Sequence, residues 1–182
     1  MSGRFIAVVG PSGVGKDSVM EAIAAREPRV VLARRVITRP SDAGGEAFDG
    51  VSAEAFAQME ARAEFALSWA AHGLSYGIPA DVDAALEAGQ DVVANLSRAV
   101  LDTARARFSQ VYVLALQADR AVLAARLAAR GRETADDIAR RLARADAHRA
   151  TGPNVWCVDN SGALEHTVVQ VLDLLYPGRV EP

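Results

Sequence analysis

Apolar residues along the chain follow two patterns, short continuous runs and helical repeats. The first run, from Phe5 to Val9, ends at Gly10-Pro11 and predicts a buried strand that enters a turn. Between Lys16 and about Arg26 the apolar residues return every three or four positions, as on one face of a helix, and Pro28 closes that helix. The chain therefore opens with a strand, a glycine-rich turn and a helix.

The same two patterns divide the rest of the chain. We predict further strands at 30–37, 65–69, 91–96, 111–116 and 155–158. We predict helices at 52–59 with Ser52 as the cap, 79–88, 97–108, 119–131, 134–148 and 163–175. The segment Thr134–Asp137 resembles a capping box at the start of the helix 134–148. A loop and a turn are predicted at 40–50 and 73–79. Strands that alternate with helices build a parallel sheet covered by helices, which is the α/β class.

Length and composition fit one globular domain. The 182 residues contain no repeat, low-complexity tract or long linker, so we expect a single domain over residues 1–182. Hydrophobic residues make up 51 % and charged residues 24 %, and the net charge of −3 argues against a nucleic acid partner. The single cysteine, Cys157, excludes an internal disulfide and lies in an apolar run, which predicts a buried thiol.

Membrane and export signals are absent from the pattern. No apolar stretch reaches the length of a membrane span, and no apolar signal-peptide core precedes the first predicted strand. We therefore expect a cytoplasmic protein with no membrane partner. The sequence does not predict the oligomeric state.

The segment from Gly10 to Ser18 carries the clearest chemistry. Its spacing Gly-x-x-x-x-Gly-Lys, between a predicted strand and a predicted helix, is typical of a phosphate-binding loop. Glycines let backbone N–H groups surround phosphate oxygens, and the start of the helix adds positive potential. Lys16, the only lysine in the chain, supplies an ammonium for the β- and γ-phosphates of ATP. The predicted nucleotide-binding residues are Gly10, Pro11, Ser12, Gly13, Val14, Gly15, Lys16, Asp17 and Ser18.

Asp17 departs from the strict form of this pattern. A serine or threonine normally follows the lysine and binds Mg²⁺, whereas here that position is a carboxylate and Ser18 comes next. A carboxylate beside a triphosphate would repel it unless a cation lies between them. We therefore hypothesise that Asp17 binds Mg²⁺, directly or through a water molecule, and that Ser18 faces a phosphate.

Arginines cluster on two consecutive predicted helices late in the chain. Arg126 and Arg130 are four residues apart, on one face of the helix that ends at Gly131, and Arg141 lies on the next helix. Phosphoryl transfer needs positive charge around the transferred group, so we predict Lys16, Arg130 and Arg141 as catalytic residues. Arg126 is predicted to contact the nucleotide. A solvated helix face paired with nearby aspartates is the alternative for each arginine.

Several segments, in chain order, resemble the guanylate kinase superfamily. They are Gly10–Lys16, Thr38-Arg39-Pro40 with Gly45-Glu46, Trp69 with Gly73–Gly77, Arg126–Gly131, Ile138–Leu142 and Val158-Asp159-Asn160. The resemblance implies the fold of P-loop NTPases, a parallel sheet sandwiched by helices, with a substrate-binding flap at about 36–80 and a helical lid at about 126–148. Guanylate kinase activity is one alternative that follows from it, and a non-catalytic binding module is another.

Two positions differ from the guanine-reading groups of guanylate kinases. The carboxylate expected before Trp69 is Ser68, and an expected Asp-x-Asp is replaced by Asn95–Arg98. A site without these groups discriminates strongly against a purine edge. A closer resemblance is to the ribose 1,5-bisphosphate phosphokinase family of phosphonate breakdown. It extends over Gly15–Ser18, Ile37–Pro40, Phe65–Trp69, Gly73–Gly77 and Asn95–Ala99.

The closer resemblance implies transfer of the γ-phosphoryl group of ATP, with Mg²⁺, to the 1-phosphate of ribose 1,5-bisphosphate. The product would be 5-phosphoribosyl 1-diphosphate (PRPP). Such a small sugar phosphate needs arginines and hydroxyl groups rather than base-reading carboxylates. The predicted substrate-binding residues are Thr38, Arg39, Ser68, Tyr76, Ser97 and Arg98. Arg39 as a solvated loop charge and Tyr76 as a packing residue are the alternatives.

Overall fold

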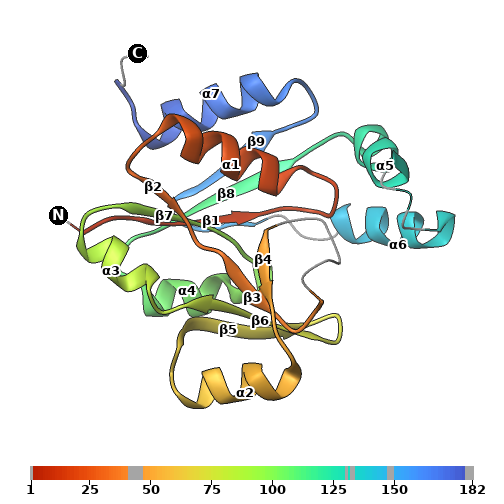
Figure 1. Ribbon diagram of the computed structural model, residues 1–182. Coiled ribbons are helices and arrows are strands. Elements are labelled where there is room, and N and C mark those ends of the chain that lie inside the picture. The colour runs from red at the N-terminus through yellow and green to blue at the C-terminus, as the bar shows by residue number, and fades with distance from the viewer. Residues whose placement is uncertain (1, 41–46, 130, 132–133, 147–149, 179–182) are drawn as a thin grey trace. The chain divides into compact units, whose positions relative to one another are not determined.

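The computed structural model describes residues 2–40, 47–129, 131, 134–146 and 150–178 (Figure 1). The chain folds into two compact units, Met1–Ala7 with Pro28–Val111, and Val8–Glu27 with Tyr112–Pro182. Strand β1, Phe5–Val9, runs through both units and is the middle strand of a five-stranded sheet of order β2-β7-β1-β8-β9. All five residues of β1 are buried, as expected for a continuous apolar run in a central strand.

The first unit holds one edge of that sheet. β7, Asp91–Asn95, is buried throughout and pairs in parallel with β2, Val30–Leu32. The Asp91 carboxylate accepts hydrogen bonds from the Arg4 backbone N–H at 2.8 Å and from the Arg4 guanidinium, so this buried charge lies beside a cation. The helices of this part are α3 (Val82–Glu87), the 3-10 helix η1 (Arg98–Val100) and α4 (Leu101–Arg107).

A second sheet in this unit, here called the flap sheet, has four strands in the order β4-β3-β6-β5. The strands are β4 (Phe48–Gly50), β3 (Arg35–Ile37), β6 (Leu74–Pro79) and β5 (Phe65–Ala71). Helix α2, Ala53–Ala61, covers one face, where Phe56 stacks on Phe65 with ring centroids 4.6 Å apart (Figure 1). Ser52 caps α2 by accepting a hydrogen bond from the Ala55 N–H, as predicted.

The second unit contains β8 (Val111–Gln117) except for its first residue, together with β9 (Val155–Asp159), α1 (Lys16–Arg26), α7 (Leu164–Leu175), α5 (Arg120–Ala129) and α6 (Ala135–Asp146). β8 pairs in parallel with β9, and α1 packs beside α7 on one face of these strands (Figure 1). At the start of α6, the Thr134 hydroxyl accepts from the Asp137 N–H and the Asp137 carboxylate accepts from the Thr134 N–H, each at 3.2 Å. This reciprocal pair confirms the predicted capping box.

The predicted α/β class is confirmed, whereas several segment predictions are wrong. The predicted strand 30–37 is broken into β2 and β3, which belong to different sheets. The predicted turn 73–79 contains β6, which pairs with both β3 and β5, and Pro79 ends that strand rather than opening a helix. The last residues of the predicted loop before α2 form β4. Cys157, predicted to be buried, is exposed because β9 is an edge strand.

Candidate functional site

The loop between β1 and α1 passes close to other side chains at two of its glycines. Gly13 has a φ of +85°, and a Cβ there would lie 3.1 Å from the Leu127 side chain. Gly15 has a φ of +92°, and a Cβ there would lie 2.8 Å from Nδ2 of Asn160. Glycine adopts such left-handed conformations without strain, and they turn backbone N–H groups toward a bound anion. The loop backbone therefore requires glycine at both positions.

Lys16 opens α1 and folds back over the loop. Its Nζ donates to the Gly10 carbonyl at 3.0 Å and to the Pro11 carbonyl at 3.4 Å, and its side chain is half-buried. Asp17 is half-buried in the first turn of α1, where the helix dipole favours a carboxylate, and Ser18 is exposed. An ammonium and a carboxylate next to such a loop suit a triphosphate and its divalent cation respectively.

Asn160, directly after β9, holds the loop from within the unit and was not predicted as a site residue. Only 3 % of it is exposed. Its Nδ2 donates to the Val14 carbonyl at 2.7 Å, and its Oδ1 accepts from the Thr167 hydroxyl at 2.7 Å. Asn160 thus joins the loop to α7. The signal in the sequence was a polar residue directly after a predicted strand, because ligands bind beyond the carboxyl ends of the strands in open α/β sheets.

Two of the predicted arginines reach the loop. Arg126 on α5 donates from Nη1 to the Val14 carbonyl at 3.3 Å, and Arg141 on α6 donates from Nη1 to the Ser12 hydroxyl at 2.8 Å. Both helices therefore direct guanidinium groups toward the segment predicted to hold phosphates. Arg130 lies outside the described residues, so its role stays a prediction.

In the first unit, three of the predicted acceptor residues lie along β3 and β6. The Thr38 hydroxyl accepts from a backbone N–H of β6 at 2.8 Å, which joins the end of β3 to that strand. The Arg39 guanidinium carbon lies 4.3 Å from the centroid of the Phe48 ring. Tyr76 stacks on Trp69, with ring centroids 5.4 Å apart and planes 8° apart. The flap sheet thus carries hydroxyl, guanidinium and aromatic groups in one region.

The other predicted acceptor residues are placed differently. Ser68 follows the alternation of β5 onto the face opposite Trp69, where its hydroxyl donates to Oε1 of Glu60 on α2 at 2.5 Å. Ser97 caps η1 by accepting from a backbone N–H at 3.4 Å, and Arg98 is the half-buried first residue of η1. Ser68 is therefore directed away from its neighbour Trp69.

Asp17 is the candidate for holding a metal ion. Among the residues that the structure describes, no three His, Cys, Asp or Glu side chains gather in a way that would bind one. Mg²⁺ in phosphoryl-transfer sites is usually held by one or two carboxylates, with substrate phosphates and water as its other ligands. A single carboxylate in the first turn of α1 fits that pattern. Separately, none of the helices in the described part of the chain has the length and apolar character needed to cross a bilayer.

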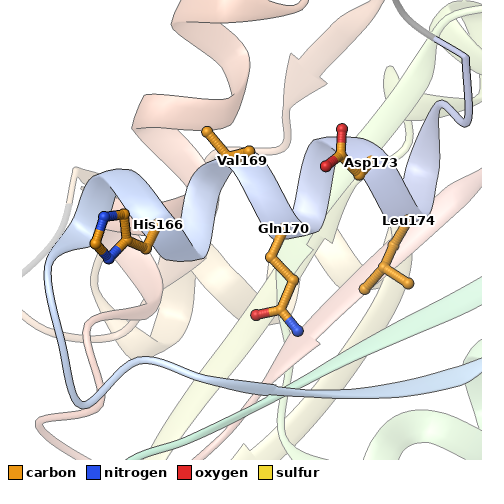
Figure 2. Close-up of a pocket in the computed structure, with 5 residues that line it drawn as sticks. All are labelled: His166, Val169, Gln170, Asp173 and Leu174. Atoms are coloured by element: carbon orange, nitrogen blue, oxygen red, sulfur yellow. The ribbon is translucent and has the colours of Figure 1, made fainter.

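The second unit also has a hollow along α7 (Figure 2). It is lined by His166, Val169, Gln170, Asp173 and Leu174. All five side chains come from one helix, and none of them is a predicted site residue. Binding sites usually join a few convergent polar groups from several elements, so we assign no ligand to this hollow.

Curated relatives match the chain over nearly its whole length, although no protein-family model matches it. A ribose 1,5-bisphosphate phosphokinase PhnN of Pseudomonas fluorescens (strain SBW25) is 51 % identical, covering 98 % of this chain and 97 % of the relative. A protein of the same name from Ruegeria sp. (strain TM1040) is 48 % identical, covering 97 % and 94 %. Another from Agrobacterium fabrum (strain C58 / ATCC 33970) is 50 % identical, covering 92 % and 95 %.

Solved structures share the fold at lower identity. A guanylate kinase from Anaplasma phagocytophilum has a TM-score of 0.68 at 16 % identity, covering 96 % of this chain and 85 % of that chain. A gluconokinase from Sinorhizobium meliloti 1021 has a TM-score of 0.55 at 22 % identity, covering 96 % and 91 %. At these identities the likeness establishes the fold alone.

Proposed function

Since the chain belongs to the ribose 1,5-bisphosphate phosphokinase family, we propose that it transfers the γ-phosphoryl group of ATP to the 1-phosphate of ribose 1,5-bisphosphate. The products are ADP and PRPP, and the reaction serves phosphonate breakdown. The observation that carries the proposal is the 51 % identity over 98 % of the chain to a relative of that name. Ser68 in place of a guanine-reading carboxylate argues against guanylate kinase, and the complete Gly10–Lys16 pattern argues against a non-catalytic module.

The donor half of the reaction would use groups of the second unit. The loop N–H groups, Lys16 and Arg126 would hold the triphosphate, with Lys16 exchanging its backbone carbonyl partners for β- and γ-phosphate oxygens. Arg141, already at the loop, would neutralise charge on the transferred group, together with Arg130 as predicted from the sequence. Mg²⁺, when bound, supplies further neutralisation of the β- and γ-phosphates, and we propose Asp17 as the residue that holds it.

The acceptor half would need positioning rather than a general base, because the attacking 1-phosphate is already ionised. An oxygen of that phosphate forms a bond to the γ-phosphorus. The bond from the γ-phosphorus to the bridging oxygen breaks, and its electron pair leaves with ADP. The residues that we propose for the acceptor are Thr38, Arg39, Ser68, Tyr76, Ser97 and Arg98. Ser68, whose hydroxyl donates to Glu60, would exchange this partner for the acceptor.

The test uses the purified full chain with ATP, Mg²⁺ and either ribose 1,5-bisphosphate or GMP, with products followed by ³¹P NMR. We expect PRPP and ADP from the sugar bisphosphate and a much smaller kcat/KM with GMP. Lys16→Met is the matched control, which should stay folded and lose nearly all activity. A larger kcat/KM with GMP would make the chain a guanylate kinase, and failure to bind ATP in calorimetry would favour the binding module.

The proposed reaction also suggests where the protein acts, how it is organised and what it binds. We propose that the chain acts in the cytoplasm, where ATP and small sugar phosphates are available. We also propose that it works as one guanylate-kinase-like domain, with the flap and lid stated above. Its partner is a small sugar phosphate, and a net charge of −3 gives no reason to propose a nucleic acid.

A further inference from the structure

Helices α5 and α6 contact the loop between β1 and α1 at consecutive loop residues, all within the second unit. Arg141 of α6 donates from Nη1 to the Ser12 hydroxyl at 2.8 Å. At the next residue, a Cβ on Gly13 would lie 3.1 Å from the Leu127 side chain of α5. Because α5 packs against the loop directly beside Ser12, the loop backbone and the position of the α6 arginine are set together.

Apolar residues anchor α6, and Arg141 lies beside them. Leu142 is buried, Ile138 is half-buried, and α6 packs against α5. Arg141 comes three residues after Ile138 and directly before Leu142, so it lies at the border of the packed face, and its side chain is exposed. An exposed arginine that meets a ligand loses rotamer entropy at that moment unless it is ordered in advance. The Ser12 hydroxyl, as one partner of the guanidinium, supplies such order.

The same bond brings two predicted catalytic cations to neighbouring residues of the loop. Nζ of Lys16 donates to the Pro11 carbonyl at 3.4 Å, and the Arg141 guanidinium donates to the next residue, Ser12. In phosphoryl transfer, negative charge spreads over the equatorial oxygens of the transferred group, and cations that are fixed beforehand stabilise it without reorganisation. Ser12 therefore keeps Arg141 on the stretch of loop where the Lys16 ammonium also lies.

We propose that Ser12 is a positioning residue for phosphoryl transfer: its hydroxyl holds the Arg141 guanidinium on the loop, in place for the transferred group. The inference rests on the donor half of the proposed function, in which this loop holds the triphosphate. It adds a task for the Ser12 side chain to the nucleotide contact predicted from the sequence. Because Ser12 acts through Arg141, its loss should slow the chemical step. ATP binding, which depends on the loop N–H groups and Lys16, should stay near wild type.

A double-mutant cycle on the full chain tests the assignment. Ser12→Ala removes the acceptor of the Arg141 bond, and we expect kcat to fall by at least about tenfold, as for the loss of one hydrogen bond to a charged group. The Kd of ATP in calorimetry should stay near the wild-type value. In the double variant with Arg141→Ala, kcat should be no lower than in Arg141→Ala alone, because the group that Ser12 positions is already absent.

Arg140 supplies the matched control on the same helix. Its guanidinium donates to Asp137 of α6 at 2.6 Å, so Arg140→Ala removes the same charge one position away from Arg141. We expect Arg140→Ala to keep kcat near wild type, and the full effect of Ser12→Ala to appear on this background. Ser12→Thr keeps a hydroxyl and should restore most of kcat.

Two results would overturn the assignment: an unchanged kcat in Ser12→Ala, or kcat losses that multiply when Ser12→Ala and Arg141→Ala are combined. Multiplied losses would mean that Ser12 acts on the nucleotide directly. A role of Ser12 in folding alone would lower Tm and leave the kcat of the folded variant near wild type, which also contradicts the assignment.

A second measurement needs no acceptor and no turnover. Binding of ADP together with aluminium fluoride, which imitates a transferred phosphoryl group, is followed by calorimetry. Ser12→Ala should weaken this complex and spare the binding of ADP alone, again with no further loss in the double variant with Arg141→Ala. If the variants behave in this way while the wild-type chain forms no PRPP, the proposed acceptor fails and the Ser12 assignment stands. If PRPP forms and the losses multiply, the Ser12 assignment fails and the proposed function stands.

Discussion

Replacing Asn160 tests how the phosphate loop is held. In Asn160→Ala the Val14 carbonyl loses its 2.7 Å donor and keeps the Arg126 guanidinium at 3.3 Å. The Thr167 hydroxyl loses its 2.7 Å acceptor and keeps its 3.2 Å bond to the Asp159 carbonyl. Two buried hydrogen bonds are lost while both partners keep another. At about 0.5–1.5 kcal/mol each, the free energy of unfolding should fall by about 1–3 kcal/mol.

This loss converts to a decrease in Tm of about 2–12 °C for a chain of this size, measured by circular dichroism. ATP affinity, measured by calorimetry, should also fall, because part of the binding free energy is then used to order the loop. Each 1.4 kcal/mol used in this way weakens binding by about tenfold. Thr167→Val is the matched control, because it removes one of the two bonds and leaves the Asn160 bond to Val14. It should lower Tm and keep ATP affinity near wild type.

Asn160→Asp separates hydrogen bonding from shape. It places a carboxylate oxygen, nearly isosteric with Nδ2, against the Val14 carbonyl. Burial and a facing acceptor raise the pKa of such a carboxyl in the folded protein above its value in the unfolded chain. The free energy of unfolding of the variant therefore decreases as pH rises through the raised pKa. We expect Asn160→Asp to be less stable than Asn160→Ala at about pH 8 and to recover partly at about pH 5, where a protonated carboxyl can donate. Wild-type Tm and ATP affinity in Asn160→Asp at the higher pH would refute the reasoning.

Three further outcomes are expected. Arg141→Ala removes the guanidinium at the Ser12 hydroxyl, so kcat should fall by about 100-fold or more while KM for ATP changes little, and a near-wild-type kcat would remove Arg141 from the mechanism. Asp17→Ala should raise the Mg²⁺ concentration for half-maximal activity by at least about tenfold, and Asp17→Ser should return that concentration toward the wild-type value. A wild-type Mg²⁺ concentration for half-maximal activity in Asp17→Ala would exclude Asp17 as the residue that holds the metal ion. Two hydrogen bonds to the Asp137 carboxylate lower its pKa to about 2: the bond from the Thr134 side chain contributes most, and the bond from Arg140 comes second. The cap that Asp137 forms is therefore present above the ordinary carboxyl pKa and lost as pH falls toward about 2, and an NMR titration should show its midpoint rising in Thr134→Ala.

Elements with local signals were predicted at or near their observed residues. β1 and α1 occupy the predicted segments, and the caps at Ser52 and Thr134 form as predicted. These features depend on residues a few positions apart, so the sequence contains all the information that they need. The phosphate-binding loop predicted at Gly10–Ser18 is also such a local feature, because its glycine spacing and its lysine lie within a few residues of one another.

The flap sheet was predicted poorly because its stability comes from distant pairing. β3 and β4 have three residues each, which is too short for any periodicity to appear. β6 resembled a turn because it contains Gly77. In the structure the Phe65 ring of β5 occupies the place of a Gly77 side chain, 2.4 Å from where a Cβ would be. From its local sequence Gly77 favours a turn, whereas in the structure it is the residue without a side chain that leaves room for the Phe65 ring.

By itself the sequence determined the α/β class and the resemblance to one kinase family, and it predicted a phosphate-binding loop at Gly10–Ser18. Only the tertiary structure decided which side chains share a surface. It placed Asn160 on the Val14 carbonyl, 146 positions away, put Arg35 over Tyr76, and turned Ser68 toward Glu60. The physical reason is that the alternation of side chains along a strand is local, whereas the register between strands and the packing of helices arise from contacts between distant parts of the chain.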